Sequence, residues 1–360
     1  MPSTLAWGFH RLADIANQRV ADNVAAVRTA VAEFVAAQNA SWNALSSSLV
    51  EVTTDSTARF TLPGTMEMQP GNELSRPTPQ RYAELFYSLG WPVQKADLAT
   101  GQTYEQQQTM DIATFAGYAQ AIGLADTKWM QRHLLGALFY NGAGYTYDDV
   151  EDTAGAITVL GLANGDTQTY LKESGALSGS TDNHYLFQST DILSASDPIP
   201  EMVTALTEHP FNSGDVFIIV SAADEAKYRA LASVYPSPDP NLQAPTSATI
   251  FIGSVPSGST PGPFLGYHSS GAYIFKWRSL PQNYAFAYMT GGTKPIRQRE
   301  KTVGSLRGFK NEAVREDYPY AEEYWVRRAG FGGWNRVGAC VKRMNQGSYS
   351  IPTGYATPMP

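Results

Sequence analysis

The stretch FNSGDVFIIVSAADEAKYRALAS, residues 211–233, joins an uninterrupted apolar run to a polar segment rich in Ala. The run DVFIIVS contains several β-branched residues and does not alternate between polar and apolar positions, which indicates a strand buried on both faces. Asp224 follows it where a helix is expected to begin. Residues 198–210 precede it with a helical pattern. The region is therefore predicted to form a helix, a buried strand and a second helix.

More strands are predicted after this unit. AYIFKWRS, residues 272–279, and NYAFAYMT, residues 283–290, are short runs rich in aromatic and β-branched residues, which is typical of strands. A segment rich in Pro, Ser and Gly, residues 236–263, separates them from the helix–strand–helix unit and is predicted to be a loop.

Two long helical regions are predicted in the first half of the chain. In residues 11–39 the apolar positions recur at spacings of four, three, four and three, as in a coiled-coil seam: Val20, Val24, Val27, Val31 and Phe34. Such a narrow stripe must be buried, and we expect a partner to cover it. Residues 104–140 carry a broader apolar face, with a break or bend expected at Gly123.

Residues 46–80 have a different character. Only 9 of these 35 residues are hydrophobic, whereas hydrophobic residues make up 43% of the whole chain. LVEVTT and ARFTL alternate as strands do, and MEMQ follows a Pro-Gly turn signal, which together predict a long β-hairpin. A lone two-stranded ribbon is only marginally stable in water. Two interpretations stay open: a mobile loop, or a ribbon that lies on a neighbouring molecule.

The segment YPYAEEYWVRRAGFGGWNRVGACVKR, residues 318–343, places five positive charges among aromatic residues and glycines. From Lys294 to Arg343 there are 12 Lys and Arg against 6 Asp and Glu, a local charge of +6 in a chain whose net charge is −7. The negative total argues against a protein that coats nucleic acid. Separate regions of opposite charge are also suited to self-association.

Catalytic and metal-binding patterns are scarce. The five histidines lack the spacing of a zinc site, and GFGGWNR does not stand between a strand and a helix as a dinucleotide fingerprint must. His268 beside Ser269 and Ser270 is attributed to loop polarity, because a triad needs a third group to orient its base. The acidic residues of YDDVEDTAG, Asp148, Asp149, Glu151 and Asp152, lack EF-hand spacing and are predicted to lie in a solvated loop rather than to bind calcium. No catalytic, cofactor-binding or metal-binding residue is predicted.

The single cysteine, Cys340, excludes an intrachain disulfide and is expected to be a small buried apolar residue. The first residues do not show a basic region followed by an apolar run, and no apolar stretch is long enough to cross a bilayer. These features predict a soluble, intracellular protein.

Three stretches resemble the major capsid proteins of tailed bacteriophages, which have the HK-ninety-seven fold. HLLGALFYNGAGYTYDD, residues 133–149, followed by ITVLGLANGD, residues 157–166, resembles the end of that family's spine helix and the turns after it. Residues 211–233 resemble the strand and helix of its A-domain, and EEYWVRRAGFGGWNRVGACVKR, residues 322–343, resembles its closing strands. Together the likeness spans most of the chain from about residue 44 onward.

The resemblance implies an α+β fold of five parts. Residues 1–45 would form an N-terminal helical arm and residues 46–80 an extended β-hairpin, the E-loop. Residues 81–191 would form a P-domain with a long spine helix, and residues 192–300 an A-domain. Residues 301–360 would supply the return strands of both domains and a C-terminal tail.

The resemblance also implies a structural protein rather than an enzyme. It would self-assemble as pentamers and hexamers of an icosahedral shell that encloses the phage genome. The implied partners are other copies of the chain, portal and scaffolding or decoration proteins, and packaged DNA without sequence specificity, but no membrane and no cofactor. The implied location is the virion, assembled in the host bacterial cytoplasm.

Interface residues are expected in two places. Arginines of residues 318–343 would pair with acids of a neighbouring copy, either Glu322 and Glu323 or the 148–152 loop, and aromatic residues would anchor the contact. Apolar residues of the hairpin would rest on another neighbour. The candidates are Arg327, Arg328, Arg336, Trp325, Phe331, Trp334, Glu322, Glu323, Phe60, Leu62, Met66 and Met68. Some members of the family link the hairpin to another subunit through a lysine, and because residues 46–80 contain no lysine we expect no such link from them.

Two other functions stay open. An encapsulin-like nanocompartment would have the same fold and would bind a cargo protein. A carbohydrate-active enzyme is the second alternative, because the chain has 42 aromatic residues. Such an enzyme would remain a small oligomer.

Overall fold

The computed structural model describes residues 19–62, 85–149, 156–178, 182–236, 262–317 and 320–355, and the single positions 68, 70, 71, 73 and 79. The chain divides into two compact units. Unit 1 comprises Met1–Ala44, Gln94–Gln131 and Glu300–Ala329, and unit 2 comprises Leu45–Val93, Arg132–Arg299 and Gly330–Pro360. Within the described residues, no helix has the length and apolar character needed to cross a membrane.

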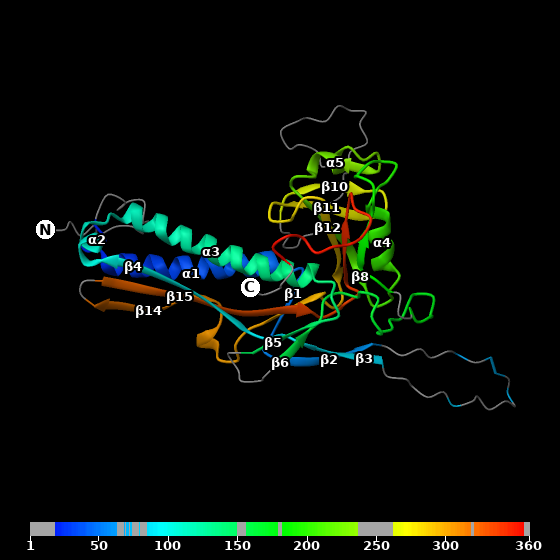
Figure 1. The fold of residues 1–360 in the computed structure, drawn as a ribbon, viewed down its shortest axis with the longest axis horizontal. Coiled ribbons are helices and arrows are strands. Elements are labelled where there is room, and N and C mark those ends of the chain that lie inside the picture. Colours follow the sequence, from blue (N-terminus) through cyan, green and yellow to red (C-terminus); the bar gives the residue numbers. More distant parts are fainter. Residues whose placement is uncertain are drawn as a thin grey trace. The chain divides into compact units, whose positions relative to one another are not determined.

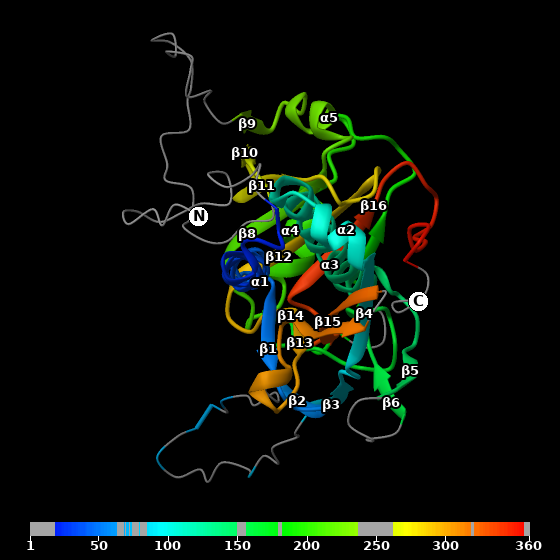
Figure 2. The same cartoon turned by 90° about the vertical axis from the view of Figure 1, so that its left-hand side faces the viewer.

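Unit 1 is built from helices and a three-stranded antiparallel sheet. Its helices are α1 (Val24–Ser46), α2 (Tyr104–Thr109) and α3 (Ile112–Phe139), together with a 3₁₀ turn, η3 (Gly304–Leu306). Its strands are β4 (Gln94–Thr103), β14 (Phe309–Asp317) and β15 (Tyr320–Gly333), with β15 in the middle. α1 lies alongside α3 (Figure 1), and the three strands lie next to one another (Figure 2). α3 and β15 continue along the chain into unit 2.

The first helix differs from its prediction in bounds and in packing. Residues 19–23 are not helical, because the chain is held there by the Val20 amide, which donates to the Met110 carbonyl at 3.0 Å. The helix begins at Val24 and runs past the predicted end to Ser46. Residues 11–18 lie outside the described residues. Val20 and Val27 are buried against Ile112, so this part of the valine stripe packs on the chain's own α3 region.

The second helical region is interrupted at Asp111 rather than at Gly123. The Thr114 amide donates to the Asp111 carboxylate at 2.7 Å, so Asp111 caps the start of α3 and separates it from α2. Gly123 lies within α3, where it serves close packing. A Cβ atom built there would lie 2.7 Å from Cζ of Phe34 on α1. Glycine therefore lets the two helices approach each other.

Unit 2 contains a seven-stranded sheet in the order β7-β16-β12-β8-β11-β10-β9. The strands are β7 (Tyr185–Phe187), β8 (Ser213–Ser221), β9 (Val234–Pro236), β10 (Phe264–His268), β11 (Ala272–Trp277), β12 (Tyr284–Gly291) and β16 (Ala339–Arg343). The helix α4 (Ile199–Thr207) packs on β8, β12 and β16, and α5 (Glu225–Arg229) follows β8 (Figure 1). The predicted helix–strand–helix unit and the strands in 272–279 and 283–290 are confirmed.

β8 is central because its side chains are apolar on both faces. It pairs in parallel with β11 and antiparallel with β12, and all of its residues from Val216 to Ser221 are buried. Cys340 of β16 is fully buried, as predicted, and burial raises the pKa of its thiol to about 12.

The remaining strands of unit 2 correct the predicted hairpin. β1 (Val50–Thr53) pairs in parallel with β13 (Ile296–Arg299), and β13 pairs antiparallel with residues 330–333 of β15. β2 (Thr57–Leu62) pairs antiparallel with β3 (Leu85–Gly90). LVEVTT and ARFTL, two of the three runs predicted for one hairpin, therefore belong to different sheets, and β2 pairs with a strand beyond residue 80. Most of the third run, MEMQ, lies outside the described residues. β5 (Tyr145–Asp148) and β6 (Ala156–Val159) form a separate pair.

Candidate functional site

Arg327 is held inside unit 1 by two helices. Its Nε and Nη2 atoms donate to the two carboxylate oxygens of Asp126 on α3, at 2.8 and 2.6 Å. Its Nη1 donates to Oδ1 of Asn39 on α1 at 3.1 Å, and Asn39 exchanges two hydrogen bonds with the backbone of Phe309. Arg327 is 3% exposed. The network ties both helices to β14 and β15 through one buried guanidinium.

The other two arginines of the predicted interface also have partners in their own chain. Arg328 donates to the carboxylate of Glu312 on the adjacent strand at 3.0 and 3.1 Å. Arg336, which is fully buried, donates to Asp166 at 2.7 Å and to the carbonyls of Gly161 and Leu162. Acids of a neighbouring copy are therefore not needed to neutralise these arginines. Contacts between copies through them stay a prediction.

The aromatic residues that were expected to anchor an interface are core residues. Trp325 stacks on Phe309 with ring centroids 5.5 Å apart, and Phe331 is buried. Trp334 meets the edge of Phe60 at 4.7 Å, and the Arg297 guanidinium lies 3.5 Å from its ring centroid. Four expected anchors, Trp325, Phe331, Trp334 and Phe60, thus stabilise the subunit's own interior.

Of the acidic candidates, Glu322 and Glu323 are half-buried and Asp149 is buried. Glu322 is half-buried and accepts a hydrogen bond from the Tyr324 hydroxyl. Glu323 is half-buried beside Trp325, and this burial raises the pKa of its carboxyl. Asp149 is not a solvated loop residue as predicted, because it is buried and accepts from Arg299 at 2.5 Å. Glu151 and Asp152 lie outside the described residues.

The β2–β3 ribbon has two unlike faces. On one face Phe60 stacks on Tyr87 with ring centroids 5.1 Å apart, and both are buried in a cluster that also contains Trp91 and Trp334. On the other face Arg59 lies 3.7 Å from the ring centroid of the exposed Phe86. The base of the ribbon therefore belongs to the core of unit 2, contrary to the prediction that it has too little apolar surface for one.

The remaining ribbon candidates lie at or beyond its outer end. The backbone of Leu62 pairs with Leu85, Met68 is 99% exposed, and Met66 lies outside the described residues.

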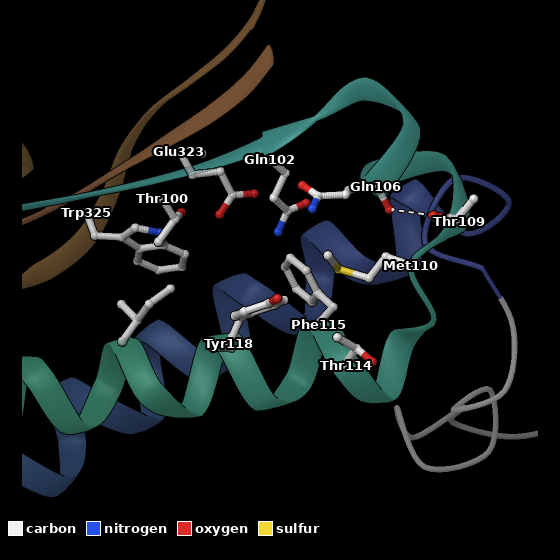
Figure 3. A pocket seen from close by; sticks show the side chains of 13 residues that line it. Thr100, Gln102, Gln106, Thr109, Met110, Thr114, Phe115, Tyr118, Glu323 and Trp325 are labelled. Atoms are coloured by element: carbon white, nitrogen blue, oxygen red, sulfur yellow. Dashed lines mark hydrogen bonds between the residues drawn. The ribbon is translucent and has the colours of Figure 1, made fainter. Parts of the chain in front are cut away.

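A groove lies in unit 1 between the α2–α3 region and the strands β4 and β15 (Figure 3). Its volume is about 470 Å³, and Phe115, Tyr118 and Met110 line its helical side. Glu323 and Trp325 line its strand side. A neighbouring cavity of about 530 Å³ lies between the valine stripe of α1 and β14. Both are mainly apolar with Glu323 among their lining residues, so this face of unit 1 is suited to bind apolar side chains.

His268 does have the third group that the sequence did not identify. Its Nε2 lies 2.8 Å from Oδ2 of Asp197, and its Nδ1 accepts from the Ser270 amide at 3.0 Å. The Ser233 hydroxyl donates to the same carboxylate oxygen at 2.5 Å. Nδ1 also lies 2.6 Å from Oγ of Ser270. These contacts join the turn between β10 and β11 to Asp197.

A second group of titratable residues is brought together from distant segments. Asp182, His184, Glu208 and His209 have ligand atoms within 4.8 Å of one another. The two histidines are 25 positions apart, with His184 just before β7 and His209 just after α4. No local spacing could reveal such a group.

The sequence matches no protein-family model and no curated protein sequence. Among solved structures, a chain of Mycobacterium phage Patience is similar over 99% of this chain and 98% of its own, with a TM-score of 0.68 and 18% identity. The capsid of an empty GTA particle is more distant, with a TM-score of 0.49, 10% identity and coverage of 84% and 90%. A virus-like particle from Pyrococcus furiosus has a TM-score of 0.41, 10% identity and coverage of 88% and 97%. The first of these matches confirms that the whole chain has the α+β fold predicted from the sequence, the HK-ninety-seven fold.

Proposed function

We propose that this chain, which has the HK-ninety-seven fold, is a major capsid protein that builds the shell of a tailed bacteriophage. Copies of the chain would form pentamers and hexamers, and these would close into an icosahedral particle around the genome. Its role would be structural, without catalytic turnover.

One observation carries the proposal. The similarity to the phage chain extends over nearly the full length of both chains. A shared sheet alone would give a shorter match. Full-length similarity includes the arm helix, the ribbon and both sheets, and these parts would meet neighbouring copies in a shell.

The exposed surfaces support particular contacts. The outer face of the β2–β3 ribbon carries Arg59 and the exposed Phe86. The exposed Met68 lies in the segment of sequence between β2 and β3. β14 is an edge strand in unit 1, and Val314 on it is 50% exposed. Open strand edges and exposed apolar side chains are sites where another chain can pair or pack. Standard interfaces bury roughly 1,600 Å² in total, and a subunit with several neighbours would exceed that.

The test is the size of the purified protein. We expect closed particles of megadalton mass in analytical ultracentrifugation, seen as shells in negative-stain microscopy, with pentamers and hexamers as intermediates. A chain that stays monomeric at high concentration would overturn the proposal.

A matched pair of variants locates the contact. Phe86→Asp changes the exposed face of the ribbon, and Lys95→Asp changes an exposed position on β4. We expect Phe86→Asp to reduce particle yield at least tenfold while the subunit stays folded, and Lys95→Asp to assemble normally. Equal assembly of both variants would mean that the exposed face of the ribbon makes no contact that assembly needs.

The other partners follow from the same role. Portal and scaffolding or decoration proteins would bind the assembled shell, and packaged DNA would be contacted without base recognition. Assembly would take place in the host bacterial cytoplasm. A nanocompartment would differ by enclosing a cargo protein in place of DNA, which mass spectrometry of purified particles would reveal.

A further inference from the structure

Four side chains of unit 2 converge at the junction of two segments. His184 and His209 are buried, Asp182 is 7% exposed, and Glu208 is partly exposed at the rim. Nε2 of His184 lies 3.3 Å from Nε2 of His209. The Asp182 carboxylate lies 3.6 Å from the first of these nitrogens and 3.3 Å from the second, and Oε1 of Glu208 lies 3.8 Å from the second.

The contacts of the two Nδ1 atoms determine whether each Nε2 carries a proton or a lone pair. Nδ1 of His184 lies 2.8 Å from the Ala339 carbonyl, and Nδ1 of His209 lies 3.0 Å from the Leu171 carbonyl. A carbonyl oxygen can only accept, so each Nδ1 must carry the proton. In a neutral ring Nε2 then presents a lone pair. Backbone carbonyls commonly orient metal-binding histidines in this way.

Without a cation this arrangement leaves several acceptors facing one another. Two nitrogen lone pairs and a carboxylate point at the same small volume. Among the described residues, Oδ2 of Asp182 has no hydrogen-bond donor although it is buried. A buried acceptor without a donor is costly, and a bound cation would remove the cost.

The spacing of the ligand atoms fits a tetrahedral ion. With Zn–N and Zn–O bonds of about 2.0–2.1 Å, neighbouring ligand atoms of a tetrahedron lie about 3.3–3.4 Å apart. Two of the measured separations, both 3.3 Å, match this edge length, and those of 3.6 and 3.8 Å are slightly longer. Asp182 makes its 3.6 and 3.3 Å contacts through its two different oxygens, and one ligand atom from each of the four residues lies within 4.8 Å of the others. Two imidazoles and two carboxylates suit Zn²⁺ better than Ca²⁺ or Mg²⁺, which prefer oxygen ligands.

Glu208 completes the group and links it to the surface. Its Oε1 faces His209, while Lys172 donates to its Oε2 at 2.7 Å and fixes the carboxylate. The Glu208 side chain is 30% exposed, which leaves an entry path for an ion. Asp182 and Glu208 together supply two negative charges at the site, one of which is shared with Lys172.

We propose that Asp182, His184, Glu208 and His209 bind a divalent transition-metal ion, Zn²⁺ in preference to Ca²⁺ or Mg²⁺, as a structural site of unit 2. The ion joins the segment that leads into β7 to the end of α4. Because Ala339 of β16 orients His184, the site also stabilises the β7–β16 edge of the sheet. The site is independent of assembly and would exist in an isolated subunit.

The experiment uses the full chain, treated with a chelator and then equilibrated with excess Zn²⁺. We expect about one Zn²⁺ per chain by elemental mass spectrometry and a higher unfolding temperature than for the chelated protein. Ca²⁺ or Mg²⁺ should not raise it. Co²⁺ should give the strong visible absorption of a tetrahedral site. Less than about a tenth of a Zn²⁺ per chain, or an equal shift with Mg²⁺, would overturn the proposal.

Variants assign the ligands. His209→Gln should lose the bound Zn²⁺ and its thermal shift, whereas His268→Gln, which replaces a buried histidine elsewhere, should retain both. Asp182→Asn preserves the shape of the ligand but removes its charge, and we expect it to weaken Zn²⁺ binding at least about tenfold. If His209→Gln does not fold, Glu208→Gln at the rim gives the same comparison. Unchanged Zn²⁺ stoichiometry in all of the ligand variants would contradict the assignment.

Discussion

The basic aromatic segment, residues 318–343, and the β2–β3 ribbon differ in a way that their sequences do not show. The mixture of arginines and aromatic residues in the first, and the polar composition of residues 46–80, which contain β2, both predict a surface that meets another molecule. The structure buries three of the four arginines and both tryptophans of the first among partners from its own chain. It buries one face of the ribbon and exposes the other. Composition therefore identifies unusual segments, but long-range partners decide which of them remain available to a neighbour.

The charge surplus of residues 294–343 has the same explanation. Five of its basic residues pair with acids outside that stretch, so the local charge of +6 is largely neutralised within the subunit. The pairs are Arg297–Glu51, Arg299–Asp149, Arg327–Asp126, Arg336–Asp166 and Lys342–Glu201. Little of the surplus remains for DNA or for another copy.

The largest expected effect comes from breaking the buried pair of the basic segment. Arg327→Ala leaves Asp126 buried without its partner, and removing one member of a buried pair typically costs about 3–5 kcal/mol. Arg328→Ala is the control, because its partner Glu312 is one-third exposed and can be solvated, so the loss should be about 1 kcal/mol. Urea unfolding of the subunit measures both.

A double variant sharpens this test. Arg327→Met with Asp126→Leu replaces the pair by apolar side chains, and we expect it to recover most of the stability lost in Arg327→Ala. If Arg327→Ala unfolds like the wild type but fails to assemble, the arginine acts between copies and the comparison fails.

The next effect separates the two faces of the ribbon. Phe60→Ala removes a buried ring from the cluster around Trp334 and should lower the free energy of unfolding by about 3 kcal/mol. Phe86→Ala on the exposed face should change it by less than about 0.5 kcal/mol. Denaturant unfolding of both variants is the measurement. Equal losses would mean that both faces are packed in solution.

A smaller effect tests whether α1, the helix of the predicted N-terminal arm, packs on α3 of its own chain. Gly123→Ala places a methyl group against Phe34 of α1 and should destabilise the subunit by about 1–2 kcal/mol. Gly117→Ala lies on the same helix with nothing within 4 Å of the new Cβ, and helix propensity should stabilise it by about 0.5–1 kcal/mol. Opposite signs in thermal unfolding are expected. If both variants are stabilised, α1 does not pack on α3 in solution.

Local sequence patterns predicted those parts of the fold that depend on local order. The apolar run of β8 and the aromatic strands β11 and β12 were identified because a buried strand has a recognisable composition. The start of α3 could also have been predicted, because aspartate is a preferred N-cap residue. In the structure the Thr114 amide, three positions farther on, donates to the Asp111 carboxylate. Gly123 was predicted to break or bend the helix, but it lies within α3 at a close contact with Phe34.

Long-range pairing could not be predicted in the same way. Val50 of β1 pairs with Ile296, and Arg327 donates to Asp126, which is 201 positions away in the sequence. Alternation predicts a strand but does not identify its neighbour, so two nearby strands were assigned to one hairpin. The group of Asp182, His184, Glu208 and His209 was missed for the same reason, because its members meet only in the folded chain.

The smallest effect concerns Glu323, the acid of the basic segment that faces the unit 1 groove. Burial raises the pKa of its carboxyl above the ordinary value of 4.5, so the folded subunit holds this proton more tightly than the unfolded chain. Stability from this group is present below pH 4.5 and is lost as the pH rises through the folded pKa. Glu323→Gln should therefore flatten the pH dependence of unfolding and slightly stabilise the subunit at pH 7, whereas Glu322→Gln serves as the control on the same strand.

In assembled particles a cation from a neighbouring copy would lower the pKa of Glu323 and reverse the sign of its contribution. Dissociation of wild-type and Glu323→Gln particles between pH 4 and pH 8 distinguishes the two cases. If the variant dissociates like the wild type, no such cation is present, and the basic segment acts only within its own subunit.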